Sequence, residues 1–431
     1  MIEYFGIFLQ LVVFIFFSYF PVNKTTSKYL TTSSKDLSAI HYFVINMPIL
    51  MFILLLFSFT EISLENAFII ILSTYLILFF LSLKEIYNYV KYKNFLIVVL
   101  FLLINFALFV DIARDLELSW DGLTTWKLRA NDFYLGSNYF NKTTDVVLPQ
   151  YPHLGTYMWA FFWKNSFLEY EYFGRLFQAY LYVLSIFAIS SCFENINFLK
   201  KKLIIVLLIL FTYQPDLRGL QDIYIFSLLI LFGFFIHQKL KLNSEINSFA
   251  ILILIILPWI KSEGIFYSIF LTIIYLVIEK KLIKKYFFSV IIFALIIFQL
   301  GMNYFYFDLR SLFQFEIDMI NIASDNSILL FFTKIINILF YSAQASFRNP
   351  IIIIDLLVII MCFYYSKFEK NNIPYLLFLF LNISFIFAIY VISPDELKWH
   401  LQTSIDRLLL QTSGIYMYLL VFLNNKKYIK I

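Results

Sequence analysis

Apolar runs long enough to cross a lipid bilayer recur along almost the whole chain, and they constrain its fold more than any other feature. A bilayer core of about 30 Å needs roughly 20 apolar residues in an α-helix. These runs predict an all-α, polytopic transmembrane helical bundle of about 13 spans. The predicted spans are residues 3–20, 42–60, 66–83, 95–112, 172–192, 203–215, 222–238, 249–261, 264–279, 286–304, 350–366, 374–393 and 405–424.

The composition excludes a soluble globular protein. Hydrophobic residues make up 61% of the chain and charged residues 14%, against roughly 45–50% and 25% in soluble domains. The net charge of +5 comes from Lys residues in short loops between the predicted spans, so it indicates membrane orientation rather than affinity for nucleic acid. Cys192 and Cys362 each lie at the end of an apolar run and give neither a disulfide framework nor metal-ligand spacing.

The Lys-rich loops predict how the bundle is oriented. Short cytoplasmic loops are enriched in Lys and Arg, and all the basic loops fall on one side if thirteen helices cross. The N-terminus is then outside and the C-terminus cytoplasmic. Residues 328–346 are apolar enough to cross, but a crossing would invert the loops that follow. We therefore expect an interfacial helix there, with Lys334 reaching towards water, and a similar helix at 153–165.

The stretch from Ser119 to Trp163 is the first long departure from the apolar pattern. It mixes charged residues with Trp and Tyr, a combination typical of a hydrated surface that recognises a polar ligand. We expect Asp121 to act as a general base, and Gly122 to let the backbone approach a ligand closely. Helix capping by Asp121 is an equally good interpretation from these residues alone. The other candidate ligand contacts here are Trp120, Trp126, Lys127 and Tyr151.

Charged residues at the ends of other predicted spans are candidates for the same site. A charge at the bilayer centre costs about 2.5–3.5 kcal/mol and tends to face a cavity or a partner. Asp222 begins a predicted span, where N-capping is the alternative role, and Arg218 is a candidate ion-pair partner for it. Lys261 and Glu263 flank a tight turn between two apolar runs. We expect these two to pair with each other, and either of them or Asp222 to face the ligand.

The segment 393–409 supplies the last group of candidates. His400, Thr403, Asp406 and Arg407 recur at helical spacing, which predicts a polar face on the helix that enters the last span. Asp406 and Arg407 are adjacent and point about 100° apart, which argues against a simple ion pair between them. A guanidinium suits a phosphate oxyanion at a membrane surface, so Arg407 is a candidate phosphate ligand. For His400, structural hydrogen bonding is the commoner role.

In their order along the chain these motifs resemble the GT-C superfamily of polytopic membrane glycosyltransferases, which includes the protein mannosyltransferases and the lipid A aminoarabinose transferases. The likeness covers roughly residues 95–424. The motifs that carry it are Trp120-Asp121 with Trp126 downstream, Tyr151-Pro152-His153-Leu154, Asp222, Lys261-Ser262-Glu263-Gly264, and the run from Leu397 to Leu409 with His400, Asp406 and Arg407.

The resemblance implies an enzyme of the bacterial inner membrane that takes a sugar from a polyprenyl phosphate on the outer face. The sugar would go to a cell-envelope glycan, lipid or protein acceptor, with Asp121 by position as the base. Residues 1–94 would form an N-terminal three-helix anchor that the family pattern lacks. Residues 95–431 would form the catalytic unit, with an outer loop at 113–171 and an outer segment at 305–349. No second acidic residue adjoins Asp121, which departs from that pattern.

The expected chemistry is inverting transfer from a phosphate leaving group. Lys261 and Arg407 are candidates to stabilise the phosphate charge, while Trp120, Trp126, Tyr151 and His400 would contact the sugar or the acceptor. The spacing of Asp121 and Asp222 gives no support for a shared divalent metal, so no cofactor is expected. The expected partners are the bilayer, the lipid-linked sugar and the acceptor.

Two other functions stay open. An O-antigen or capsule polymerase is also polytopic with a large outer loop, but it would concentrate Arg in two long loops, and this chain has few Arg outside. A flippase or transporter for lipid-linked glycans would show inverted repeats and helices broken by Gly or Pro. The chain contains only 10 Gly and 9 Pro, which disfavours that class.

Overall fold

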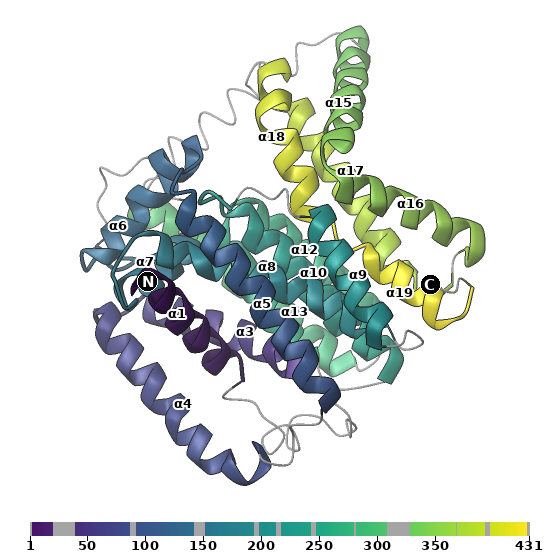
Figure 1. Ribbon diagram of the computed structural model, residues 1–431. Helices are drawn as coiled ribbons and strands as arrows, with labels where there is room; N and C mark the ends of the chain where they lie inside the picture. Colours follow the sequence, from purple (N-terminus) through teal and green to yellow (C-terminus); the bar gives the residue numbers. More distant parts are fainter. Residues whose placement is uncertain are drawn as a thin grey trace. The chain divides into compact units, whose positions relative to one another are not determined.

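Helices are the only regular secondary structure in the part of the chain that the computed structural model describes (Figure 1), which confirms the all-α prediction. The described residues are 2–19, 39–86, 92–141, 151–193, 198–212, 217–242, 247–279, 282–307, 328–367, 369–392 and 397–428.

The chain divides into two compact units. The first comprises Met1–Leu210 and Asp216–Ser268, and the second comprises Phe211–Pro215 and Ile269–Ile431. The boundary that we expected between residues 94 and 95 does not coincide with this division. It falls inside the first unit, where α1 (Ile2–Tyr19) and α3 (Ala39–Phe57) pack directly against α5 (Tyr92–Arg114) and α8 (Tyr172–Ser191).

The first unit is built around α8, whose residues from Tyr172 to Ser190 are all buried. A helix that is apolar on all sides is stable only when other elements surround it, and α8 packs against α3, α5, α7 and α10. The other helices wholly inside this unit are α4 (Leu64–Ile86), the π-helical turn η1 (Gly122–Lys127), α6 (Leu128–Tyr134), α7 (Leu154–Lys164), α10 (Asp222–Leu242) and α11 (Asn247–Ile260). Two helices begin in the first unit and end in the second, α9 (Phe198–Thr212) and α12 (Glu263–Ile278).

The expectation that residues 153–165 lie at the membrane interface is wrong. They form α7, and every residue from Leu154 to Phe162 is buried. The helix packs against α4, α6 and α8. Its sequence has aromatic and aliphatic side chains on all faces, so it has no polar face to present to water, and burial among other helices is the stable arrangement.

Two residues of the polar stretch 113–171, Tyr139 and His153, are tied to the end of α3 by hydrogen bonds to one serine. The Ser58 hydroxyl and His153 Nε2 share a hydrogen bond of 2.7 Å, and the backbone N–H of Tyr139 donates to the Ser58 carbonyl at 2.9 Å. The His153 ring also packs against Trp259 of α11, with ring centroids 5.6 Å apart. His153 is buried and holds three parts of the first unit together.

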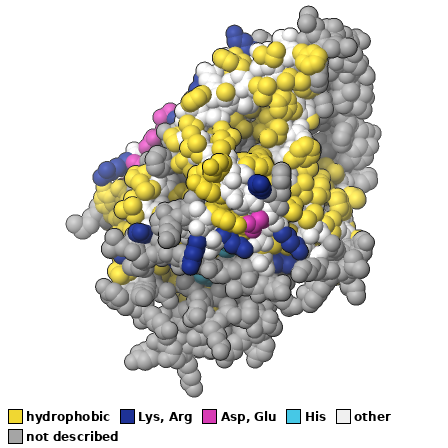
Figure 2. Space-filling model, turned by 90° about the vertical axis from the view of Figure 1, so that its right-hand side faces the viewer, with side chains coloured by type: hydrophobic (Ala, Val, Ile, Leu, Met, Phe, Trp, Pro, Cys, Tyr) yellow, Lys and Arg dark blue, Asp and Glu magenta, His cyan; other side chains and the backbone are white. Residues whose placement is uncertain are grey.

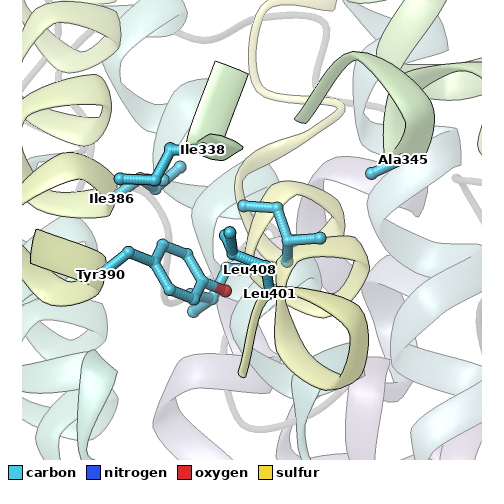
Figure 3. Close-up of a cluster of buried hydrophobic side chains, with 7 residues drawn as sticks. Ile338, Ala345, Ile386, Tyr390, Leu401 and Leu408 are labelled. Carbon is cyan, nitrogen blue, oxygen red and sulfur yellow. The ribbon is translucent and has the colours of Figure 1, made fainter. Parts of the chain in front are cut away.

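The second unit contains a cluster of buried apolar side chains between three helices. They are α15 (Ile328–Arg348), α17 (Ile373–Ile392) and α18 (Leu397–Thr412). Figure 3 shows side chains of this cluster, which consists of Ile338, Ala345, Ile386, Tyr390, Leu401, Ile405 and Leu408. The remaining helices are α13 (Leu282–Phe307), α16 (Pro350–Tyr365) and α19 (Met417–Asn425).

The predicted span at 405–424 is not one helix. The chain leaves the helical path after Thr412 and starts α19 at Met417. Gly414 lies between them with φ of +84°, a left-handed conformation that glycine adopts without steric cost. Its N–H donates to the carboxylate of Asp355 in α16 at 2.7 Å. The break therefore has a local cause, which the hydrophobicity of the run does not reveal.

Lys334 of α15 does not reach towards water as we expected. Its Nζ donates to the backbone carbonyl of Val391, in the last turn of α17, at 3.0 Å. Carbonyls at a helix C-terminus are unpaired within the helix and carry partial negative charge, so they suit an ammonium group. Whether α15 lies in the interface stays a prediction; it meets α16 at a bend of 107°.

Seven described helices are long and apolar enough to cross a membrane, and the bent pair α15–α16 is an eighth candidate. This finding supports a membrane-embedded protein. Hydrophobic side chains also cover much of the described surface in Figure 2, with Lys and Arg gathered mainly in a band below them in that view. The seven are Ile2–Tyr19, Ala39–Phe57, Leu64–Leu81, Leu96–Arg114, Tyr172–Ser191, Asp222–Leu240 and Ile373–Val391.

Candidate functional site

Tyr151 lies at the centre of a group of charged side chains in the first unit. Burial raises the pKa of Tyr151, the negative charges of Glu263 and Asp121 also raise it, and the positive charges of Lys261 and Arg129 lower it. These four residues come from two segments of the chain, since Asp121 and Arg129 lie in one and Lys261 and Glu263 in the other. The charges of Asp121, Lys261, Glu263 and Arg129 thus all act on Tyr151, while the prediction that the candidate residues form one ligand site stays a prediction.

Lys261 is held between two carboxylates. Its Nζ lies 2.9 Å from Asp222 Oδ1 and 2.9 Å from Glu263 Oε1. The expected pairing of Lys261 with Glu263 is confirmed, and Asp222 joins it at the first turn of α10. Only 3% of the Asp222 side chain and 12% of the Lys261 side chain are exposed, so solvent screens the pair weakly.

The turn that places Lys261 is very tight. A Cβ added to Gly264 would lie 2.0 Å from the carbonyl oxygen of Leu257, so only glycine lets α12 start this close to α11. The turn thus sets the distance from Lys261 to Glu263.

Asp121 does not cap a helix. Its backbone is already helical, with φ of −62° and ψ of −37°, and its side chain makes no capping hydrogen bond. Ser119 serves in its place, because its Oγ accepts the N–H of Gly122 at 3.0 Å. The capping alternative for Asp121 is therefore excluded, and its partly buried carboxylate is close enough to Tyr151 for its charge to raise the pKa of that residue.

Gly122 has a different role from the one that we expected. A Cβ at this position would lie 2.4 Å from the carbonyl oxygen of Arg218, so the close approach is to the chain's own backbone rather than to a ligand. Ser119 donates its backbone N–H to the same carbonyl at 3.0 Å. The side chain of Arg218 forms an ion pair on the surface with Glu117, in which Nη1 lies 3.7 Å from Oε1.

Arg129 is the buried cation of the site. It is 6% exposed and lies close to two aromatic rings, with its Cζ 5.4 Å from the Tyr151 centroid and 5.8 Å from that of Trp126. The two rings are stacked at 6.1 Å. Trp126 and Ala130 anchor this segment by packing against Trp159 of α7 and Leu220.

Within the described residues, Arg129 has no carboxylate within ion-pair distance. Nη1 donates to the Pro152 carbonyl at 3.5 Å, and Nε has no hydrogen-bond partner. Burial lowers the pKa of Arg129 to about 10, so the guanidinium is still cationic at neutral pH. A buried, uncompensated guanidinium is costly to the fold and well suited to an anionic ligand.

The π-helical turn Gly122–Lys127 lies between Asp121 and Arg129. Such turns insert a residue into the regular hydrogen-bond ladder and occur often at functional sites. Here the turn sets the angular offset along the helix between the carboxylate and the guanidinium. The short segment therefore carries a carboxylate, a buried guanidinium and Trp126, on which Tyr151 stacks.

Trp120 and Lys127 point elsewhere. Trp120 is 77% exposed. The charge of Lys127 acts on Glu171, whose pKa is raised by burial and lowered by Arg175 and Lys127. Glu171 Oε1 lies 3.2 Å from Nε of Arg175, whose side chain is 1% exposed. Lys127 thus belongs to a second buried ion-pair group that the sequence analysis did not find.

The candidates His400, Asp406 and Arg407 lie on α18 in the second unit. The His400 ring packs against Tyr390 at 4.8 Å, and Asp406 Oδ2 pairs with Arg348 Nη1 at 3.2 Å. This ion pair of Asp406 is with a residue of α15 and not with its neighbour in the sequence, in agreement with the argument against a simple pair of Asp406 and Arg407. Arg407 is partly buried. Arg407 and His400 belong to the second unit and Asp121 belongs to the first, so their convergence stays a prediction.

The spacing of residues in the sequence could have identified Arg129 as a residue of the site. Arg129 follows Trp126 by three residues, which places both on one helix face. Asp355 was also missed, although it is a single carboxylate inside an apolar run, and the cost of a charge at that depth marks such residues.

Among the described residues no group of three or more His, Cys, Asp or Glu side chains is placed to hold a metal. A metal between Asp121 and Asp222 has no further support.

No family model matches the chain, and no curated protein or solved structure matches it.

Proposed function

We propose that the protein is a membrane glycosyltransferase that moves a sugar from a polyprenyl phosphate to a cell-envelope glycan, lipid or protein acceptor. The observation that supports this most is Arg129, a buried guanidinium to which no described residue supplies a carboxylate partner, and which acts on Tyr151 together with Asp121. Transfer from a lipid phosphate needs both an anion-binding group and a base, and these two residues can supply them.

The chemistry is simple because the leaving phosphate is already ionised. Asp121 removes the proton from the acceptor hydroxyl as that oxygen attacks the anomeric carbon. The bond from this carbon to the phosphate oxygen breaks, and the phosphate leaves with the electron pair. A positioned base contributes about 10²–10⁴-fold to such a step. Attack from the face opposite the phosphate inverts the anomeric centre.

Arg129 takes the phosphate role that we first gave to Lys261. The ammonium of Lys261 is already balanced by Asp222 and Glu263 at 2.9 Å each, so it has less charge to offer an anion. Arg129 has donors to spare, and a planar guanidinium fits two phosphate oxygens at once. Arg407 stays a second candidate for the phosphate.

The aromatic side chains suit a sugar. The stacked pair Trp126 and Tyr151 presents ring faces beside Arg129, and Trp120 is exposed for contact with an acceptor or with lipid. Asp222 and Glu263 orient Lys261, which is then a donor for sugar hydroxyls. His400 and Asp406 are proposed for the acceptor side.

The proposal also includes the number of spans, the membrane and the orientation of the bundle. It is a GT-C-like bundle of about 13 spans in the bacterial inner membrane, with the N-terminus outside and the C-terminus in the cytoplasm. The seven to eight described helices that suit a span are part of that number. The loop 113–171 then faces outwards, where polyprenyl-phosphate sugars are used.

The test is transfer by purified protein in lipid nanodiscs, supplied with polyprenyl phosphates that carry radiolabelled glucose, mannose or arabinose and with an extract of envelope acceptors. We expect label to move to an acceptor with the wild type and not with Asp121→Asn. Asp132→Asn is the matched control, because Asp132 lies on the same loop and accepts from Ser137 at 2.9 Å, away from Tyr151. Near-normal turnover by Asp121→Asn would refute the base assignment.

A carrier for lipid-linked glycans is the second candidate, and one observation favours it. The break between α18 and α19 beside a buried carboxylate is a feature of transporters with discontinuous helices. Proteoliposomes distinguish the two functions, because a carrier moves a fluorescent lipid-linked glycan across the bilayer without changing its covalent structure.

A further inference from the structure

Asp355 is a buried carboxylate that the proposed transfer reaction does not use. It lies in α16, with four isoleucines before it and two leucines after it, and is 4% exposed. Within the described residues it forms no ion pair. A carboxylate in such surroundings is costly when ionised and must be neutralised by a proton or by a cation.

Asp355 lies at the point where the polypeptide unwinds between α18 and α19. Its Oδ2 accepts the N–H of Gly414 at 2.7 Å. The side-chain amide of Asn382, on α17, donates to Thr412 Oγ1 at the end of α18 at 2.9 Å. The unwound residues are thus fixed from α16 on one side and from α17 on the other.

Three buried side-chain oxygens near the break between α18 and α19 are not satisfied by hydrogen bonds. Asp355 Oδ1, Asn382 Oδ1 and the Tyr416 hydroxyl have no hydrogen-bond partner among the described residues. The Tyr416 hydroxyl lies close to the Asp355 carboxylate and to the Asn382 side chain without a hydrogen bond of regular geometry to either, and its ring packs against Phe378 at 6.1 Å. The residues are each 4% exposed, so bulk water does not satisfy these oxygens.

We propose that Asp355, Asn382 and Tyr416, with the unwound segment Ser413–Tyr416, form a binding site for a monovalent cation the size of Na⁺. The donor set is oxygen only, which is what hard cations prefer. One carboxylate balances one positive charge, whereas a divalent ion would leave an unbalanced charge in an apolar place. The C-terminal end of α18 adds partial negative charge, and unwound helices coordinate Na⁺ in this way.

A proton alone explains the geometry less well. A protonated Asp355 would need an acceptor within hydrogen-bonding distance, and Oδ1 has none. A cation is held at longer oxygen-to-oxygen separations, because the ion occupies the space between the oxygens. This argument does not depend on the glycosyltransferase proposal.

The first experiment is thermal unfolding of the purified full-length protein in nanodiscs at pH 7.5, in NaCl, KCl or choline chloride at equal ionic strength. A ligand that binds only the folded state stabilises it with saturation. We expect Na⁺ to raise the apparent Tm by roughly 3–8 °C relative to choline. Equal Tm values in Na⁺ and choline would overturn the proposal.

Asp355→Asn is expected to abolish the difference between Na⁺ and choline. Glu369→Gln, which removes a carboxylate from a surface hydrogen bond with Tyr428 in the same unit, is expected to keep it. If Na⁺ still raises the Tm of Asp355→Asn, the stabilising ion binds at another site and the proposal is overturned. If Asp355→Asn does not fold, Asn382→Leu decides, since it keeps the carboxylate and should raise the half-saturating Na⁺ concentration by about tenfold.

Direct binding of ²²Na⁺ by scintillation proximity is the second readout. We expect saturable binding that non-radioactive NaCl displaces and that Asn382→Leu weakens. An Asn382→Leu protein with the same affinity as the wild type would contradict the site. A Tm that changes with pH but not with Na⁺ would identify a proton as the occupant and likewise contradict it.

Discussion

Lys261 Nζ lies 2.9 Å from Asp222 Oδ1, and this ion pair joins the start of α10 to the turn between α11 and α12. The same ammonium contacts Glu263 at 2.9 Å, so one cation holds two carboxylates at the edge of the charged group around Tyr151. Its position makes it a structural centre for the site as well as a candidate ligand contact.

Removing this cation should destabilise the protein strongly. Lys261→Met leaves the 3% exposed Asp222 carboxylate buried without its partner, and breaking a buried pair in this way costs about 3–5 kcal/mol. The measurement is thermal unfolding followed by tryptophan fluorescence. The double variant Lys261→Met/Asp222→Asn should recover much of the loss, since no unpaired charge then remains on α10. A single variant as stable as the wild type would show that the pair is not buried in the membrane-embedded protein.

Arg129→Met should separate stability from function. Burying a guanidinium without a carboxylate partner is costly, so its replacement by an apolar side chain of similar length should leave the apparent Tm unchanged or higher. If Arg129 binds the donor phosphate, the KM for the polyprenyl-phosphate sugar should rise by about 10–100-fold. Arg129→Lys should recover only part of this, because the planar fork is lost. An unchanged KM in Arg129→Met would remove Arg129 from the donor site.

Gly122→Ala and Gly301→Ala form a matched pair. A Cβ at Gly122 would lie 2.4 Å from the Arg218 carbonyl oxygen, so the segments must separate, and we expect a loss of about 1–3 kcal/mol. Gly301 lies in α13 with nothing within 4 Å of an added Cβ. Alanine there should stabilise the protein by about 0.4–1 kcal/mol because it restricts the unfolded chain. Unfolding temperatures of the two variants should therefore move in opposite directions, and a shift in the same direction would contradict the contact.

Arg407→Lys tests the phosphate role of the second unit. If Arg407 forms a bidentate contact with the donor, lysine should raise the KM for the lipid-linked sugar by about tenfold, because a point charge cannot reproduce the fork. The control is Arg348→Lys, whose side chain is 57% exposed and pairs with Asp406 on the surface. Exposed pairs contribute little, so this control should change the apparent Tm by only a small amount. Equal donor KM values in wild type and Arg407→Lys would leave the phosphate to Arg129.

The helices could be predicted because hydrophobicity alone determines where a chain can enter a membrane. The break at Gly414 could not, because it depends on the hydrogen bond to Asp355, 59 residues away along the chain. The burial of α7 was missed for a related reason. Hydropathy cannot distinguish a helix surrounded by protein from one that lies against lipid.

The charged group was predictable in part. Lys261 and Glu263 are neighbours in the sequence, so their pairing needed only a tight turn. Asp222 could be grouped with Lys261 and Glu263 because all three residues were predicted to lie at span ends on the same side of the membrane. Arg129 was missed because a loop arginine is usually solvated, and only the packing of Trp126 and Tyr151 beside it shows that it is buried.

The two hydrogen bonds that Ser58 makes to His153 and to the backbone of Tyr139 have a consequence for engineering of the protein. Through Ser58 the first helices hold both His153 and the backbone at Tyr139 in place. A chain shortened to begin after residue 94 would lose that brace and, with it, the shape of the loop that carries Asp121. The N-terminal helices thus act as an internal template for the positions of Tyr139 and His153, and a shortened protein should retain them.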